Sequence, residues 1–177
     1  WFRLGRSLTL ISDKRVLLSW SGTMFEYLMP LLIMKDYNYT LLNETYIGAV
    51  IGQKKYGERR RVPWGISESA YNAFDRHMNY QYKAFGVPKL GLKRGLVDDL
   101  VIAPYASILA MQIDPHGAMD NINKLISEGL QGEYGLYEAI DYTHSRVPRN
   151  RNSVVVKSFM AHHQGMSLIA IDNVLND

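Results

Sequence analysis

The feature that most constrains this chain is a long stretch, residues 62–96, in which hydrophobic side chains follow neither a helical nor a strand period. Gly, Pro, Asn and Tyr recur there too often for a buried helix, and loops of this length inside compact domains commonly carry function. The stretch contains "WGISES" (64–69), in which one carboxylate, Glu68, lies among Gly, Ser and Trp. A second stretch of similar composition begins at Gln131. Any functional site is therefore sought first in these two stretches.

The segments around them show helical patterns. Helices are expected over 15–34 in two pieces that meet near Gly22, over 43–60, over 103–113, over 114–130 and over 153–174. Asn43 is the expected N-cap of the second helix. Pro104 suits the first position of the third. Asp114 as cap and Pro115 at the first helical position give the fourth a strong start signal.

No series of strand patterns alternates with these helices, so the sequence argues against a parallel α/β sheet. Helices joined by short turns and by long functional loops are typical of a helical toroid. The expected fold class is therefore all-α, an (α/α)6 toroid. A complete ring of this kind needs roughly twice this chain length, at about 11 to 15 residues per helix plus connections. Residues 1–177 are accordingly expected to form one domain that holds only part of the ring.

Composition narrows the function classes. The chain is 47% hydrophobic and 21% charged, which is typical of a globular domain. No run of about 18 apolar residues occurs, so no membrane contact is expected from this segment. The net charge of +3 is carried by scattered basic residues, which does not favour nucleic acid as a partner. Because the chain has no cysteine, disulfides and thiolate metal sites are excluded.

Three glutamates lie in unusual company: Glu26 in "SGTMFEYLMP", Glu68 in "WGISES" and Glu138 in "YGLYEAIDYT", with Asp141 close by. A carboxyl group beside aromatic side chains can have a raised pKa and donate a proton near neutral pH. Glycoside cleavage needs two such groups, roughly 5 Å apart for retention and 6.5 to 9.5 Å for inversion. The structural alternatives are an ion pair with Arg for Glu26 and local capping for the other two.

"FMAHHQGMSL" supplies a second group of candidates, His162, His163 and Gln164. Adjacent histidines on a helix point about 100° apart and do not form the i, i+4 pair that zinc uses, so no metal is expected. These side chains could instead bind sugar hydroxyls, although a buried structural histidine remains the alternative. No phosphate loop, nucleophile elbow or dinucleotide motif is present, and no cofactor is expected.

Six motifs carry a resemblance to a known family: "LLSWSGTMFEYLMPLL", "VPWGISESAYN", "NYQYKAFGVPKLGLKRGL", "DDLVIAPYASILAM", "YGLYEAIDYT" and "SFMAHHQGMSL". Together they resemble, in order and over almost the whole chain, the middle, glycoamylase-like domain of cyclic β-1,2-glucan synthases. The resemblance implies a toroid that cleaves linear β-1,2-glucan and transfers it to its own far end, producing a ring. It also implies a cytoplasmic domain of a larger inner-membrane protein, whose other domains are partners together with the glucan.

The resemblance also implies residue roles. Glu68 and Glu138 are the expected principal carboxylates, with Glu26 as a rival. The residues expected to bind substrate are Trp64, Tyr71, Tyr80, Tyr82, His162, His163 and Gln164. Three alternatives stay open: an inverting endo-β-1,2-glucanase of the same fold, a segment that binds glucan without turnover, and a helical scaffold with no glucan affinity.

Overall fold

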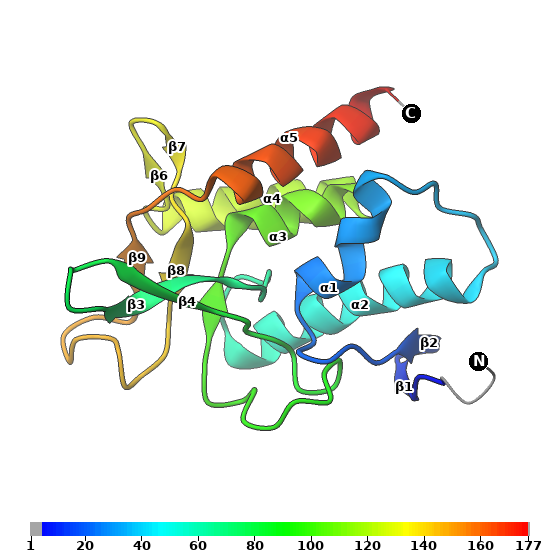
Figure 1. Ribbon diagram of the computed structural model, residues 1–177, viewed down its shortest axis with the longest axis horizontal. Helices are drawn as coiled ribbons and strands as arrows, with labels where there is room; N and C mark the ends of the chain where they lie inside the picture. Colours follow the sequence, from blue (N-terminus) through cyan, green and yellow to red (C-terminus); the bar gives the residue numbers. More distant parts are fainter. Residues whose placement is uncertain (1–4, 177) are drawn as a thin grey trace.

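The computed structural model describes residues 5–176, and it corrects the expected fold class. The described chain is a mixture of helices and short antiparallel strands rather than an all-α toroid (Figure 1). Its α-helices are α1 (Met24–Leu28), α2 (Leu41–Arg60), α3 (Pro104–Leu109), α4 (Pro115–Ser127) and α5 (Ala161–Asn176). Two 3-10 helices follow α1 and α3, η1 (Met29–Leu32) and η2 (Ala110–Gln112).

The strands form four small antiparallel sheets within residues 5–176. Three are hairpins: β1 (Leu8–Ile11) with β2 (Lys14–Leu17), β3 (Ser69–Phe74) with β4 (Tyr80–Lys83), and β6 (Gln131–Gly132) with β7 (Gly135–Leu136). The fourth has the order β5 (Val101–Ile102), β8 (Ala139–Asp141), β9 (Val154–Val156). These strands have two to six residues, which is too short for a clear alternation of apolar and polar side chains, and the all-α expectation failed for that reason.

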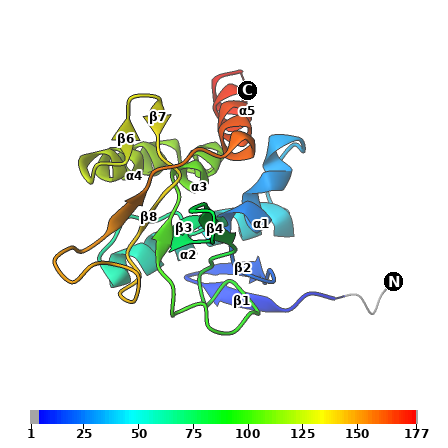
Figure 2. The ribbon, with the colours of Figure 1, turned by 60° about the vertical axis from the view of Figure 1, so that its left-hand side comes forward.

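The helices pack around α3. Helix α3 contacts both α4 and α5, and α1 contacts α2 and α3 (Figures 1 and 2). Helix α2 also lies along the β1–β2 hairpin. A single cluster of buried apolar side chains runs through these contacts, with Leu28, Ile66 and Ile140 among its fully enclosed members. Strand β3 packs against β8 and β9, which brings both aperiodic stretches of the sequence together.

Several local signals in the sequence are confirmed. Asp114 accepts a hydrogen bond from the Gly117 N–H at 2.9 Å, and Pro115 opens α4, as predicted. Pro104 likewise opens α3. Gly22 has φ +71 and separates the two parts of the segment 15–34, but the first part is the strand β2 and not a helix.

Two helix boundaries differ from expectation. The N-cap of α2 is Thr40, whose hydroxyl accepts from the Asn43 N–H at 3.1 Å, so the helix begins before Asn43. The final helix begins at Ala161 and not near Ser153, because residues 154–156 pair with β8. Its buried face nevertheless includes His163, as the helical spacing predicted.

Candidate active site

The segment "WGISES" is an extended strip held by side-chain amides of two helices. Gln53 of α2 bonds both the N–H and the carbonyl of Ile66 at 2.8 Å. Asn121 of α4 does the same for Trp64, at 3.0 and 2.7 Å. The strip passes so close to α3 that a side chain at residue 65 would contact Ser107, and the φ of +118 there also favours glycine. This double clamp fixes the backbone that leads to Glu68.

Glu68 precedes β3 and is half-buried, while its neighbours Ser67 and Ser69 are fully buried. The Tyr105 hydroxyl lies 2.7 Å from Ser67 Oγ and 3.0 Å from the Glu68 carbonyl oxygen. Burial raises the pKa of the Glu68 carboxyl, and the nearby charge of Glu26 raises it further. The nearby His163 and Tyr82 oppose this rise without cancelling it. Glu68 is therefore a carboxyl group that retains its proton more readily than an ordinary glutamate.

Glu26 lies in the first turn of α1 and closes a capping box with Thr23. Its Oε2 accepts from the N–H groups of Ser21, Gly22 and Thr23 at 2.9, 3.0 and 3.4 Å. Its Oε1 accepts only from the Ser21 N–H, at 3.2 Å. The carboxylate is half-buried. The cap thus fixes Glu26 in place and leaves Oε1 the less occupied oxygen.

Glu138 precedes β8 and is 2% exposed. Its oxygens lie 3.0 and 3.1 Å from His163 Nδ1, and one of them accepts from the Ala70 N–H at 3.2 Å. His163 is itself 1% exposed and stacks on Tyr105 with ring centroids 3.7 Å apart. Glu138 and His163 therefore form an enclosed pair behind the surface.

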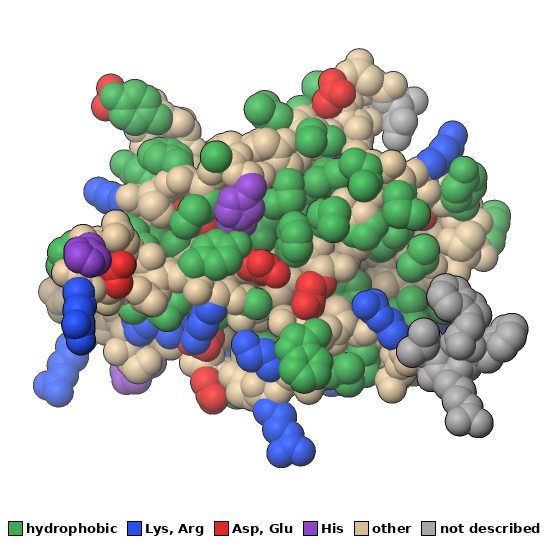
Figure 3. Space-filling model, in the orientation of Figure 1, with side chains coloured by type: hydrophobic (Ala, Val, Ile, Leu, Met, Phe, Trp, Pro, Cys, Tyr) green, Lys and Arg blue, Asp and Glu red, His purple; other side chains and the backbone are tan. Residues whose placement is uncertain are grey.

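Tyr82 connects this pair to the surface. Its hydroxyl lies 3.2 Å from His163 Nε2 and 3.5 Å from His162 Nε2. Burial and the charges of Glu68 and Glu138 raise the pKa of Tyr82 far above its usual value, so the phenol keeps its proton. Burial and the neighbouring His163 lower the pKa of His162. Figure 3 shows acidic side chains in the middle of one face, beside a histidine and surrounded by hydrophobic side chains.

The structure thus brings five of the sequence candidates into one connected group, which we call the acidic centre: Glu26, Glu68, Glu138, Tyr82 and His163. His162 and Gln164 lie at its edge in the first turn of α5, and both are exposed.

The other three candidates lie apart from it. Trp64 is 7% exposed and enclosed in the core. Tyr71 lies on the opposite face of the β3–β4 hairpin from Tyr82 and packs edge-on against Phe85. Tyr80 stacks on Phe74 near the turn of that hairpin, with ring centroids 4.5 Å apart.

Two residues of interest were missed from the sequence. Tyr105 was interpreted only as part of an apolar helix, although it stacks on His163 and binds Ser67. Trp20 is 67% exposed, yet its backbone is firmly held: its carbonyl accepts from the Lys93 N–H at 2.8 Å, and the next N–H binds Glu26. A tryptophan exposed on rigid backbone is unusual, and its place beside Gly22 in "SWSG" was the only available signal.

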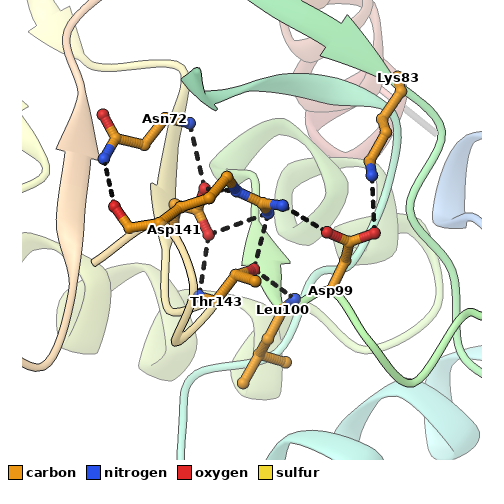
Figure 4. Close-up of polar contacts among 7 residues, drawn as sticks. Asn72, Lys83, Asp99, Leu100, Asp141 and Thr143 are labelled. Carbon is orange, nitrogen blue, oxygen red and sulfur yellow. Dashed lines mark hydrogen bonds and ion pairs between the residues drawn. The ribbon is translucent and has the colours of Figure 1, made fainter.

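A second polar group, the Arg146 cluster, supports the other face of the hairpin and is defined by Asn72, Lys83, Asp99, Asp141, Thr143 and Arg146 (Figure 4). Arg146 binds Asp141 through Nε at 2.7 Å and Asp99 through its other nitrogen at 2.5 Å. Lys83 binds the second oxygen of Asp99 at 2.7 Å. Burial raises the pKa of Asp99, but the two cations outweigh it and the net pKa is lowered.

Within residues 5–176, no three His, Asp or Glu side chains are grouped in a way that could hold a metal ion. No helix in that part of the chain combines the length and the hydropathy needed to span a membrane.

With fold and site in view, the class of the protein follows: the chain belongs to the glycoamylase family, whose model, described as "Putative glucoamylase", matches residues 1–177. A particular relative is the cyclic β-(1,2)-glucan synthase NdvB of Rhizobium meliloti (strain 1021), which is 49% identical over 175 residues. The match covers 99% of this chain and 6% of that protein, so the chain spans a small part of the relative's length. The resemblance predicted from the motifs is confirmed.

Two solved structures share the fold. An endo-β-1,2-glucanase from Chitinophaga pinensis, solved with sophorotriose and glucose, matches with a TM-score of 0.64 and 17% identity, over 99% of this chain and 42% of that one. A β-1,2-glucanase from Parabacteroides distasonis matches with a TM-score of 0.61 and 21% identity, over 95% of this chain and 24% of that one. At these identities the similarity concerns the fold alone.

Proposed function

We propose that this segment carries the acid-base centre of an enzyme that cleaves linear β-1,2-glucan and transfers it to its own far end, forming a cyclic glucan. The observation that carries the proposal is the raised pKa of Glu68 beside a second carboxylate, Glu26, on a face with exposed aromatic side chains. Family membership and the name of the 49% identical relative support the same substrate class.

In the proposed mechanism Glu68 donates its proton to the leaving glycosidic oxygen. Glu26, whose Oε1 is its less occupied oxygen, faces the anomeric carbon or the attacking hydroxyl. Glu138 was the favoured second carboxylate from the sequence. We assign it a supporting role because it is 2% exposed and both its oxygens face His163. Tyr82, His162 and Gln164 are the proposed contacts to sugar hydroxyls, and Trp20 offers a flat surface for a ring.

The reaction is tested with the protein carrying this segment in its native sequence context. It is incubated with linear β-1,2-glucan, and the products are separated by mass, because a ring is one water lighter than the linear glucan of equal length. Rings support transglycosylation. Linear products alone would identify an endo-β-1,2-glucanase, the second candidate, which the fold shared with the Chitinophaga enzyme favours. Binding without any turnover would leave only a glucan-binding role.

The carboxylate roles are tested by neutralising each in turn. Glu68→Gln and Glu26→Gln should each reduce turnover by about 100-fold or more, the usual range for a lost acid or base. Glu138→Gln should reduce turnover less. If Glu68→Gln and Glu138→Gln both retained full activity, the proposed site would be wrong.

A further inference from the structure

We propose that Glu138, His163 and Tyr82 form a directional hydrogen-bond relay that holds Glu68 in its protonated, proton-donating form. Glu138 is in this view a positioning residue, which acts on Glu68 through two other side chains. The inference rests on the proposed role of Glu68 as the acid and adds what keeps it ready for proton transfer.

The relay begins with the buried pair. A carboxylate can only accept hydrogen bonds, and both Glu138 oxygens lie within 3.1 Å of His163 Nδ1. The pair is enclosed, and Tyr105 stacks on the imidazole and fixes its plane. The ring proton is therefore placed on Nδ1, in the arrangement by which a carboxylate selects one histidine tautomer. His163 Nε2 is then left without a proton and must accept.

The next step is at Tyr82. Its hydroxyl lies 3.2 Å from His163 Nε2. A phenol has one proton, and here that proton is needed by the accepting nitrogen. The oxygen of Tyr82 therefore presents only lone pairs to its remaining neighbours, which are His162 Nε2 at 3.5 Å and the Glu68 carboxyl group.

The last step is at Glu68, which lies close enough to Tyr82 for each group to shift the pKa of the other. A protonated carboxyl can donate to the Tyr82 lone pair, whereas an ionised carboxylate would face that lone pair and be repelled. The hydrogen-bond direction thus adds to the two effects that already favour the protonated form, burial and the charge of Glu26.

The groups that face Glu68 from the surrounding elements complete the account. They are Glu26 from α1, Tyr82 from β4, Tyr105 from α3, and His162 and His163 from α5, with Glu138 behind them. Tyr105 contacts the Glu68 carbonyl oxygen and not its carboxyl group. Within residues 5–176, no Lys or Arg forms an ion pair with any of these three glutamates.

The relay predicts the pH dependence of turnover. An acid catalyst must be protonated, so activity falls as pH rises through its pKa. Tyr82→Phe removes the acceptor that favours protonated Glu68. The alkaline limb of the pH profile should therefore move to lower pH by about half to one unit, the equivalent of one hydrogen bond. Tyr134→Phe, at a tyrosine that is 81% exposed on the β6–β7 turn, is the matched control and should cause no shift.

Two variants of His163 separate a relay from simple packing. His163→Gln can keep the polarity, because its amide N–H can donate to Glu138 while its carbonyl accepts from Tyr82. His163→Leu fills similar space without either bond. The relay predicts that the glutamine variant keeps the alkaline limb near its original pH, whereas the leucine variant moves it down as Tyr82→Phe does. Equal limbs in both variants would contradict the relay.

The decisive readout is independent of turnover. The relay predicts that 15N NMR of His163 shows a neutral ring with the proton on Nδ1, and that 13C NMR of the Glu68 carboxyl shows titration at lower pH in Tyr82→Phe. A doubly protonated ring, a proton on Nε2, or an unchanged Glu68 titration would overturn the relay. If these signals behave as expected but linear glucan is not turned over, the proposed function fails and the relay stands.

Discussion

The two faces of the β3–β4 hairpin support polar clusters that differ in charge balance. On one face, the Arg146 cluster combines two aspartates with an arginine and a lysine, and its buried Asp141 accepts from Arg146, Asn72 and Thr143. On the other face, the acidic centre holds three glutamates, and its contacts come from histidine, tyrosine and backbone N–H groups.

The difference in balance indicates a difference in role. Ions that neutralise one another inside a protein are fixed in their charge state, as the lowered pKa of Asp99 and the raised pKa of Arg146 show. Carboxyl groups without a cation keep a pKa that can respond to a substrate, as the raised pKa of Glu68 shows. We therefore interpret the Arg146 cluster as the support of the hairpin and the acidic centre as its functional side.

The largest expected effect is on stability at the Arg146 cluster. Arg146→Met leaves Asp141, which is fully buried, without its ionic partner, and losing one member of a buried ion pair costs about 3 to 5 kcal/mol. Urea unfolding measures this loss. The matched control is Lys54→Met, which removes an ion pair to Asp114 whose side chains are 35% and 33% exposed, and should cost less than about 1 kcal/mol. Similar losses in both variants would remove the contrast between buried and exposed pairs.

A smaller effect of opposite sign is expected at the acidic centre. Because the folded pKa of Glu68 is raised, its contribution is favourable at low pH and is lost as pH rises through the folded pKa. Glu68→Gln removes this dependence, so the variant should be more stable than the parent at pH 8 by a few tenths to about 1 kcal/mol, since the group is partly exposed. The gain should vanish near pH 4. A variant that is destabilised at pH 8 would place Glu68 with the structural group.

The smallest effect on the fold is expected at Trp20. Trp20→Ala should change the free energy of unfolding by less than about 0.5 kcal/mol, because the side chain is 67% exposed. It should weaken glucan binding several-fold through the lost ring contact, and Trp20→Phe should weaken it less. Titration calorimetry in a Glu68→Gln background separates binding from turnover. Unchanged affinity in Trp20→Ala would remove Trp20 from the substrate surface.

Part of the fold could be predicted from local signals alone. Asp114 and Pro115 fix the start of α4, and Pro104 the start of α3, because capping needs only a few neighbouring residues. The sheets could not be predicted in this way. Val101 pairs with Asp141, forty residues further on, and a two-residue strand such as β5 has no period to detect. The all-α expectation was wrong because these pairings are set by tertiary contacts.

The site shows the same division. Individual candidates such as Glu68, Glu138 and His163 could be selected by their unusual neighbours in the sequence. Their connection could not, because it depends on β3 packing against β8 and on α5 covering the end of α3. The burial of Trp64 was equally out of reach, since the amide clamp from Asn121 joins residues 57 positions apart.

The most direct test of the central claim is the turnover of linear β-1,2-glucan by Glu68→Gln, compared with Glu133→Gln, an exposed glutamate in the β6–β7 hairpin. The account predicts a loss of about 100-fold or more for Glu68→Gln with the fold retained, and no loss for Glu133→Gln. Full turnover by a folded Glu68→Gln protein would contradict the assignment of the acidic centre as the functional side of the hairpin.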